Sequence, residues 1–220
     1  MASGGQVNRE TLLIMFDYGN VLALHDRLEI CQRFAKHSRC SAHEIASRIF
    51  NTEIEYDSES GRYDSHEHFR RVKAAVEGDE RWAYEEFVDE YKNVFTLNEE
   101  AVRALSYAAQ RARVYILSNT TYLHSLWLFE QEILATLPES YIFSFKVGVM
   151  KPDPEIWRIA IDRAGVSPRM CLYVDDLQPY CAAAEALGIA SIHYRRGVTD
   201  LLGEIGKWAE AAAPTAVRGF

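Results

Sequence analysis

Polar residues follow three apolar segments of the chain, at the point where each segment ends. Asp17 follows LLIMF, Ser118 and Asn119 follow ARVYIL, and Asp175 and Asp176 follow MCLYV. Acidic groups from two such ends can hold a hard divalent cation such as Mg²⁺, which takes one or two carboxylates and completes its shell with water and substrate phosphate.

A lysine and two small polar side chains add donors to this acidic set. The Ser118 hydroxyl, the Asn119 amide and the Lys151 ammonium all suit phosphoryl oxygens, and Lys151 also balances the acidic charge. A metal, these donors and a free carboxylate together describe phosphoryl transfer.

Each of these residues also has a purely structural interpretation. Ser118 and Asn119 are preferred helix caps, Lys151 can be a solvated lysine, and Asp175 and Asp176 can open a helix at its positive end. Individually these interpretations are favoured. Together they are less economical, because one sheet edge would then gather three carboxylates, a lysine and an amide without using them.

The elements that must position these residues are strands of a parallel sheet. A short apolar run bounded by turn residues is typical of a buried strand, and ligands of open α/β sheets lie at the carboxyl ends of the strands. From Asn98 onward, helices and strands alternate, with a further short strand expected in YIFSFKVG and a helix over 122–133. In KPDPEIWRIAIDRAG, Asp153 caps a helix that starts at Pro154 and ends at Gly165. The pattern predicts an α/β fold, a Rossmann-like parallel sheet between two helical layers.

Residues 26–95 carry no strand pattern. Helices are expected over 26–38, after the capping box of Ser41 and Glu44, from Asp64, and over 82–95, whereas the acidic segment 51–61 is predicted as a loop. We therefore predict an all-helical cap domain over 26–95, placed as a lid on a catalytic core of residues 1–25 and 96–220.

Composition narrows the function classes. The 220 residues carry 24 Lys and Arg against 32 Asp and Glu, a net charge of −8, without a long basic run, which disfavours nucleic acid as a partner. The short polar lead Met1–Glu10 resembles no signal peptide, and no apolar run is long enough to cross a bilayer, so a cytoplasmic protein without a membrane partner is expected. The four cysteines lie far apart and are expected to be reduced, buried thiols.

Four motifs in this order, FDYGNVL, LSNT, VGVMKPDPEIW and YVDD, resemble those of the haloacid dehalogenase-like superfamily. The resemblance implies a Rossmann-like core, a helical cap inserted after the first motif, and a Mg²⁺-dependent hydrolase of a small phosphorylated metabolite. It further implies roles for six residues, with Asp17 as nucleophile, Ser118 and Asn119 holding the phosphoryl group, Lys151 stabilising it, and Asp175 and Asp176 holding Mg²⁺. Within the acidic pair Asp176 is favoured as the direct ligand, and the Gly19 carbonyl would complete the coordination beside Asp17.

Gly19 is a departure from the resemblance, because most phosphatases of this superfamily carry a second Asp there as general acid and base. Proton transfer by a placed side chain contributes about 10²–10⁴-fold to the rate. Either the substrate is an activated ester such as a sugar 1-phosphate, which the DYGNVL subgroup suggests, or Asp26 or His25 supplies the proton. Asp26 can equally cap the next helix.

The cap is expected to determine the substrate, with Tyr18, His25, Arg27 and Tyr122 as candidates that face the cleft. His66 and His68 lie two apart, on different helix faces, and are expected at the surface rather than at a metal. Two other functions stay open: a 2-haloacid dehalogenase, which needs no Mg²⁺ and has little use for paired aspartates, and a catalytically weak binding protein. A monomer or small homo-oligomer is expected.

Overall fold

The computed structural model describes residues 11–212, so the polar lead Met1–Glu10 and residues 213–220 lie outside the described part. Its main sheet has five parallel strands in the order β5-β4-β1-β6-β7. These strands are β1 (Leu13–Phe16), β4 (Arg113–Ser118), β5 (Ser140–Phe143), β6 (Cys171–Asp175) and β7 (Ala190–His193). The strand that ends at Asp17 is therefore the central one, which confirms the predicted parallel sheet.

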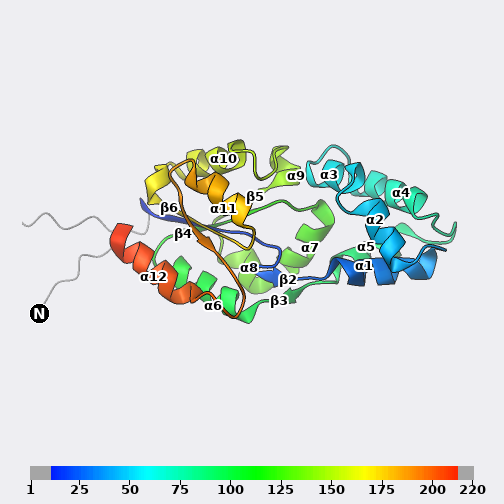
Figure 1. Cartoon of the computed structure of the whole chain (residues 1–220), viewed down its shortest axis with the longest axis horizontal. Coiled ribbons are helices and arrows are strands. Elements are labelled where there is room, and N and C mark those ends of the chain that lie inside the picture. Colours follow the sequence, from blue (N-terminus) through cyan, green and yellow to red (C-terminus); the bar gives the residue numbers. More distant parts are fainter. Residues whose placement is uncertain (1–10, 213–220) are drawn as a thin grey trace, which may run out of the picture.

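Helices cover both faces of this sheet (Figure 1). One face carries α10 (Glu155–Ala164) and α11 (Gln178–Glu185), and the other carries α6 (Glu99–Ala109) and α12 (Leu201–Ala212). Successive side chains of a strand point to opposite faces. Leu13 accordingly shares a buried cluster with Trp157 of α10, and Ile14 shares the other with Leu105 of α6. The three-layer Rossmann-like core is confirmed.

Five α-helices lie within residues 26–95 of the chain and gather at the end of the molecule opposite α12 (Figure 1). They are α1 (Arg27–Phe34), α2 (Ala42–Ile49), α3 (Glu53–Glu59), α4 (Ser65–Ala75) and α5 (Tyr84–Lys92), with a 3₁₀ turn η2 (Ala35–His37) after α1. A two-stranded antiparallel ribbon, β2 (Ala23–Leu24) and β3 (Thr96–Leu97), joins them to the sheet. We call residues 26–95 the cap and the remaining described residues the core; the division into two domains stays a prediction.

Local sequence signals explain most of the cap. The capping box is present, since the Glu44 carboxylate accepts from the Ser41 N–H at 2.7 Å and the Ser41 hydroxyl accepts from the Glu44 N–H at 3.3 Å. The side chains of Asp26 and Asp64 cap α1 and α4. The prediction of a loop over 51–61 was wrong. This segment contains α3, which begins after Thr52, whose hydroxyl accepts from the Ile54 N–H at 3.2 Å.

In the core, the bounds of some helices and strands differ slightly from those predicted from the sequence. The segment YIFSFKVG is a strand only to Phe143, because α9 (Ser144–Val147) follows at once and ends at Gly148 in a left-handed conformation. The helix expected over 122–133 is divided into α7 (Tyr122–Glu130) and α8 (Glu132–Thr136), and a 3₁₀ turn η3 (Pro168–Met170) precedes β6. The α10 helix starts one residue later than predicted and ends at Gly165 as predicted.

Two predictions from composition can be compared with the described residues. All four cysteines are buried free thiols, as expected. Among the helices of residues 11–212, none combines the length and the apolar character needed to cross a membrane.

Candidate active site

Asp17 lies directly after β1, at the carboxyl end of the sheet. Its N–H donates to the Val174 carbonyl at 2.9 Å, which extends the pairing of β1 with β6. Its Oδ1 accepts from the Tyr18 N–H at 2.8 Å and lies 3.0 Å from the Lys151 Nζ. The central strand thus delivers this carboxylate to the edge where ligands of parallel α/β sheets bind.

Lys151 is buried between two carboxylates. Its Nζ lies 3.0 Å from Asp17 Oδ1 and 2.7 Å from Asp175 Oδ2, and it donates to the Tyr173 hydroxyl at 2.9 Å. Burial by itself would lower the pKa of Lys151, but the two carboxylates outweigh this effect and raise it. The ammonium is therefore permanently charged and fixed beside Asp17.

The two adjacent aspartates have different surroundings. Asp175 is fully buried, and its carboxylate accepts from Lys151, from the Tyr173 hydroxyl and, at 2.7 Å, from the Leu177 N–H. Asp176 is only partly buried, and its carboxylate makes no ion pair within residues 11–212. Asp175 therefore organises Lys151, and Asp176 is the one open to a ligand.

The three aspartates form a group that fits a hard divalent cation. Asp17, Asp175 and Asp176 each offer an oxygen, and these atoms lie within 4.8 Å of one another. Burial above all, opposed by Lys151 and reinforced by Asp175, raises the pKa of Asp17 to about 7. One ammonium balances three carboxylates here, so a further positive charge would relieve their repulsion, and the oxygen donors are those that Mg²⁺ prefers.

Ser118 and Asn119 follow β4 but have different partners. Ser118 is buried and close enough to Asp17 to lower its pKa by hydrogen bonding. The Asn119 amide instead contacts the main chain of Lys151: its Oδ1 accepts from the N–H at 2.8 Å and its Nδ2 donates to the carbonyl at 3.0 Å. The resemblance implied that this side chain holds the phosphoryl group, whereas in the structure it holds the lysine segment.

The ring of His25 lies against Gly19. A Cβ added at Gly19 would lie 3.4 Å from His25 Cε1, and His25 Nδ1 is buried with no hydrogen-bond partner in the described residues. Burial, with Arg27 as a second cause, lowers the pKa of His25 to about 4. Asp26 is exposed and caps α1 by accepting from the Leu28 N–H at 2.8 Å. Of these two candidate proton donors, His25 is the one at the site.

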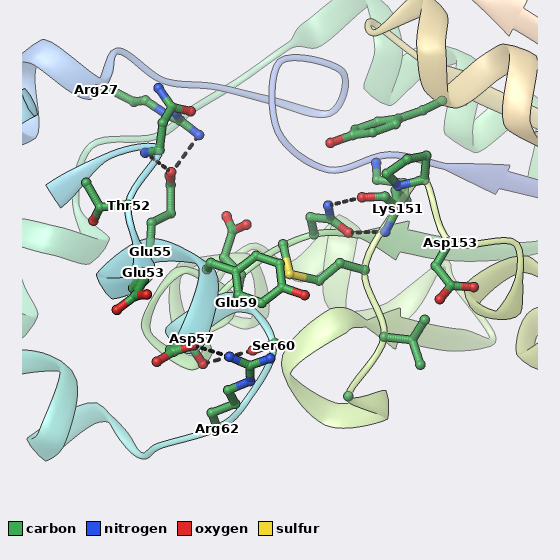
Figure 2. Close-up of a pocket in the computed structure, with 18 residues that line it drawn as sticks. Arg27, Thr52, Glu53, Glu55, Asp57, Glu59, Ser60, Arg62, Lys151 and Asp153 are labelled. Atoms are coloured by element: carbon green, nitrogen blue, oxygen red, sulfur yellow. Dashed lines mark hydrogen bonds and ion pairs between the residues drawn. The ribbon is translucent and has the colours of Figure 1, made fainter.

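A cavity of about 420 Å³, which we call the inner cavity, lies over this edge of the sheet. Core residues Asp17, Ser118 and Asp176 line it together with cap residues Arg27, Glu55 and Glu59. It adjoins the outer cavity, of about 1010 Å³, drawn in Figure 2. The two share Arg27, Asn51, Glu55, Glu59, Asn119 and Tyr180. The catalytic edge of the core therefore faces the cap.

The other expected cleft residues vary in position. Arg27 lines both cavities, and its guanidinium lies 2.8 Å from Glu55. The Tyr18 ring is buried 5.1 Å from that of Phe95, with its hydroxyl donating to the His124 carbonyl, and Tyr122 is exposed and outside both cavity linings. Sequence reasoning missed the carboxylates of α3 because it predicted a loop there.

A parallel α/β core with a carboxylate cluster beneath a helical cap defines the class of this protein. A model of the family described as haloacid dehalogenase-like hydrolase matches residues 12–188, and the chain belongs to this family. It is thus a hydrolase by family, as the four motifs predicted.

Two curated relatives are named as phosphatases. A D-ribitol-5-phosphate phosphatase of Bacteroides thetaiotaomicron is 28% identical over 193 residues, which cover 84% of this chain and 92% of the relative. A phosphatase of Mycobacterium tuberculosis is 28% identical over 123 residues, 52% of this chain and 57% of the relative.

Solved structures share the fold. A haloacid dehalogenase family enzyme of B. thetaiotaomicron, solved as a magnesium complex, has a TM-score of 0.75 at 22% identity, over 87% of this chain and 96% of that one. A predicted hydrolase of the family from Porphyromonas gingivalis has a TM-score of 0.76 at 22% identity, over 90% of this chain and 97% of that one. A dehalogenase has a TM-score of 0.64 at 19% identity, over 86% of each chain.

Proposed function

We propose that this protein is a Mg²⁺-dependent phosphohydrolase of a small phosphate monoester. The observation that carries the proposal is the grouping of Asp17 and Asp176 on the core side of the inner cavity, which the cap faces, with the Lys151 ammonium 3.0 Å from Asp17. The two phosphatase relatives and the magnesium complex of a structural neighbour support it.

Asp17, Asp176 and the Gly19 carbonyl would hold the metal, with Asp175 adding charge behind them. Bound Mg²⁺ supplies positive charge that lets an anionic phosphoryl group approach three carboxylates. Asp175 has its oxygens engaged by Lys151, Tyr173 and Leu177, and therefore contributes mainly by charge and by positioning Lys151.

The proposed reaction has two displacements at phosphorus. The Asp17 carboxylate attacks the phosphorus and the bond to the leaving oxygen breaks, which leaves an aspartyl-phosphate; water then attacks this intermediate and releases inorganic phosphate. The Lys151 ammonium and the Ser118 hydroxyl donate to the phosphoryl oxygens, where negative charge develops. The Asn119 amide keeps Lys151 in place for this task.

The substrate that fits this proposal is a small phosphorylated metabolite whose organic part lies under the cap. Because Gly19 provides no acid, activated esters such as sugar 1-phosphates are the first candidates, in line with the subgroup that DYGNVL resembles. His25 beside Gly19 stays a candidate base, since its low pKa keeps the ring neutral near pH 7. Asp26 is the weaker candidate because its carboxylate caps α1.

One assay tests the proposal. We expect wild-type protein to hydrolyse p-nitrophenyl phosphate and members of a sugar phosphate panel with Mg²⁺ but not with EDTA, and Asp17→Asn to be inactive. Metal-independent chloride release from a 2-haloacid would instead establish a dehalogenase. Absence of turnover with every compound would favour a binding protein.

A further inference from the structure

The C-terminal end of α3 brings a cap carboxylate to the catalytic edge of the core. Glu59, the last residue of this helix, lines both the inner and the outer cavity. Figure 2 shows Glu59 between the cap helix and the segment that carries Lys151. Its charge interacts with those of Lys151 and Asp17, so it belongs to the electrostatic surroundings of the site.

The position of Glu59 over the core is fixed by a close approach two residues later. Gly61 has a φ of +70°, and a Cβ added there would lie 2.1 Å from the Phe145 carbonyl oxygen of α9. Only a glycine permits this approach between the cap backbone and the core backbone. The end of α3 therefore rests directly on the core.

Glu59 differs from Glu55 and Asp57 on the same helix in having no partner among the described residues. Glu55 pairs with Arg27 at 2.8 Å, and Asp57 pairs with Arg62 at 2.7 Å. For Glu59, by contrast, no hydrogen bond or ion pair occurs within residues 11–212, although the side chain is only partly exposed. A carboxyl group that faces a cavity without a partner is available to a substrate.

Resting on the proposed phosphohydrolase activity, we propose that Glu59 is the general acid and base of this enzyme and replaces the carboxylate that Gly19 lacks. In the first displacement the Glu59 carboxylic acid gives its proton to the leaving oxygen as that oxygen departs with the electron pair of its bond to phosphorus. In the second, the Glu59 carboxylate takes a proton from the water that attacks the aspartyl-phosphate. Asp17 leaves as a carboxylate, and Glu59 ends protonated, as it began.

The electrostatic surroundings of Glu59 suit this role. Burial first, and then the charges of Glu55 on the same helix and Asp17 of the core, raise the pKa of Glu59 to about 8. Arg27 of α1 and Lys151 of the core oppose the shift. Two tyrosines that also interact with Glu59, Tyr91 and Tyr180, have raised pKa values and stay neutral near pH 7.

The different pKa values of Glu59 and His25 decide which of the two can act as the proton donor at neutral pH. A pKa of about 8 leaves Glu59 protonated and able to donate, whereas a pKa of about 4 leaves His25 neutral and unable to donate a proton to the leaving oxygen efficiently. Because the protonated form of Glu59 is the active one, the rate should fall as the pH rises through about 8.

The test compares phenol leaving groups that share one ring and differ in pKa. Wild type, Glu59→Gln and Glu59→Asp are assayed in Mg²⁺ on a series of substituted phenyl phosphates, from p-nitrophenyl phosphate to phenyl phosphate. For Glu59→Gln we expect a loss of about 10²-fold or more in kcat/KM with phenyl phosphate and a much smaller loss with p-nitrophenyl phosphate, which needs little protonation. Glu59→Asp should recover part of the loss, and the alkaline limb of the wild-type profile should disappear in Glu59→Gln.

Glu85→Gln is the matched control, because Glu85 is an exposed carboxylate of the cap outside both cavity linings. Equal losses for all leaving groups in Glu59→Gln, or an unchanged alkaline limb, would overturn the assignment of Glu59 while leaving the phosphohydrolase intact. Lack of any phosphate release by the wild type would overturn both.

Discussion

The side-chain amide of Asn119 makes two hydrogen bonds to the main chain of Lys151: Oδ1 accepts from the main-chain N–H at 2.8 Å, and Nδ2 donates to the main-chain carbonyl at 3.0 Å. The two residues lie on different segments of the core, so this pair connects the end of β4 to the loop that carries the ammonium. It makes Asn119 a positioning residue for the Lys151 side chain.

Replacing Asn119 with alanine should therefore impair both stability and catalysis. Losing two hydrogen bonds to partly buried main chain should cost about 1–3 kcal/mol of unfolding free energy, measured by urea denaturation. Looser placement of Lys151 should lower kcat for p-nitrophenyl phosphate by roughly tenfold or more. Asn93→Ala, which removes an exposed amide of the cap, is the control, and equal kcat in both variants would contradict the positioning role.

The different surroundings of the two adjacent aspartates predict different responses to metal. Mg²⁺ that binds only the folded wild type should stabilise it by about 2.7 kcal/mol at roughly 100 times its Kd, a rise of about 5 °C or more in Tm. Asp176→Asn should keep the metal-free Tm and lose most of this rise. Asp175→Asn should instead lower the metal-free stability, by up to about 3 kcal/mol, because Lys151 loses a buried partner.

Thermal unfolding with and without EDTA measures both effects. The proposed division of roles would be contradicted if Asp176→Asn retained the full Mg²⁺ response or if Asp175→Asn unfolded at the wild-type temperature.

His68 predicts a pH dependence of stability. The expectation that it lies at the surface was wrong, since it is 1% exposed, with neither ring nitrogen hydrogen-bonded in the described residues. Burial lowers its pKa from 6.5 to about 4, so between these values the unfolded chain binds the proton and the folded protein does not. Burial of the neutral His68 ring therefore costs no stability from protonation above pH 6.5. As the pH falls from 6.5 towards 4, the free energy of unfolding should decrease by about 3 kcal/mol.

His68→Phe should flatten this part of the acid limb of Tm against pH. His66→Phe is the control, because His66 is exposed on the same helix. An acid limb in His68→Phe as steep as that of the wild type would rule out His68 as a contributor.

The close contact between the cap and the core at Gly61 predicts that any side chain at this position lowers the stability of the protein. Gly61→Ala combines left-handed strain with a clash against the Phe145 carbonyl, and we expect a loss of about 2–5 kcal/mol in unfolding free energy. Gly148→Ala shares the positive φ, here +73°, but would meet nothing within 4 Å, so it should lose only about 1–2 kcal/mol. Equal losses in urea denaturation would show that the cap does not rest on the core at Gly61.

Sequence reasoning was most successful where local physics decides the structure. The apolar run before Asp17 became the central strand, and α10 ended at Gly165, because a buried strand and a glycine cap depend on residues within a few positions. It failed over 51–61, since α3 has little apolar periodicity. That helix depends on the Thr52 cap and on burial of Glu55 and Ser58 in the cap.

The sequence by itself determined which chemical groups stand at the ends of the strands, and it placed Asp17, Lys151, Asp175 and Asp176 at one edge of a parallel sheet. Only the tertiary structure decided how these groups pair. The engagement of Asn119 with Lys151, the saturation of Asp175 and the open side chain of Glu59 depend on contacts between segments far apart in the chain. Such contacts follow from the order of the strands and from the docking of the cap, which no local pattern encodes.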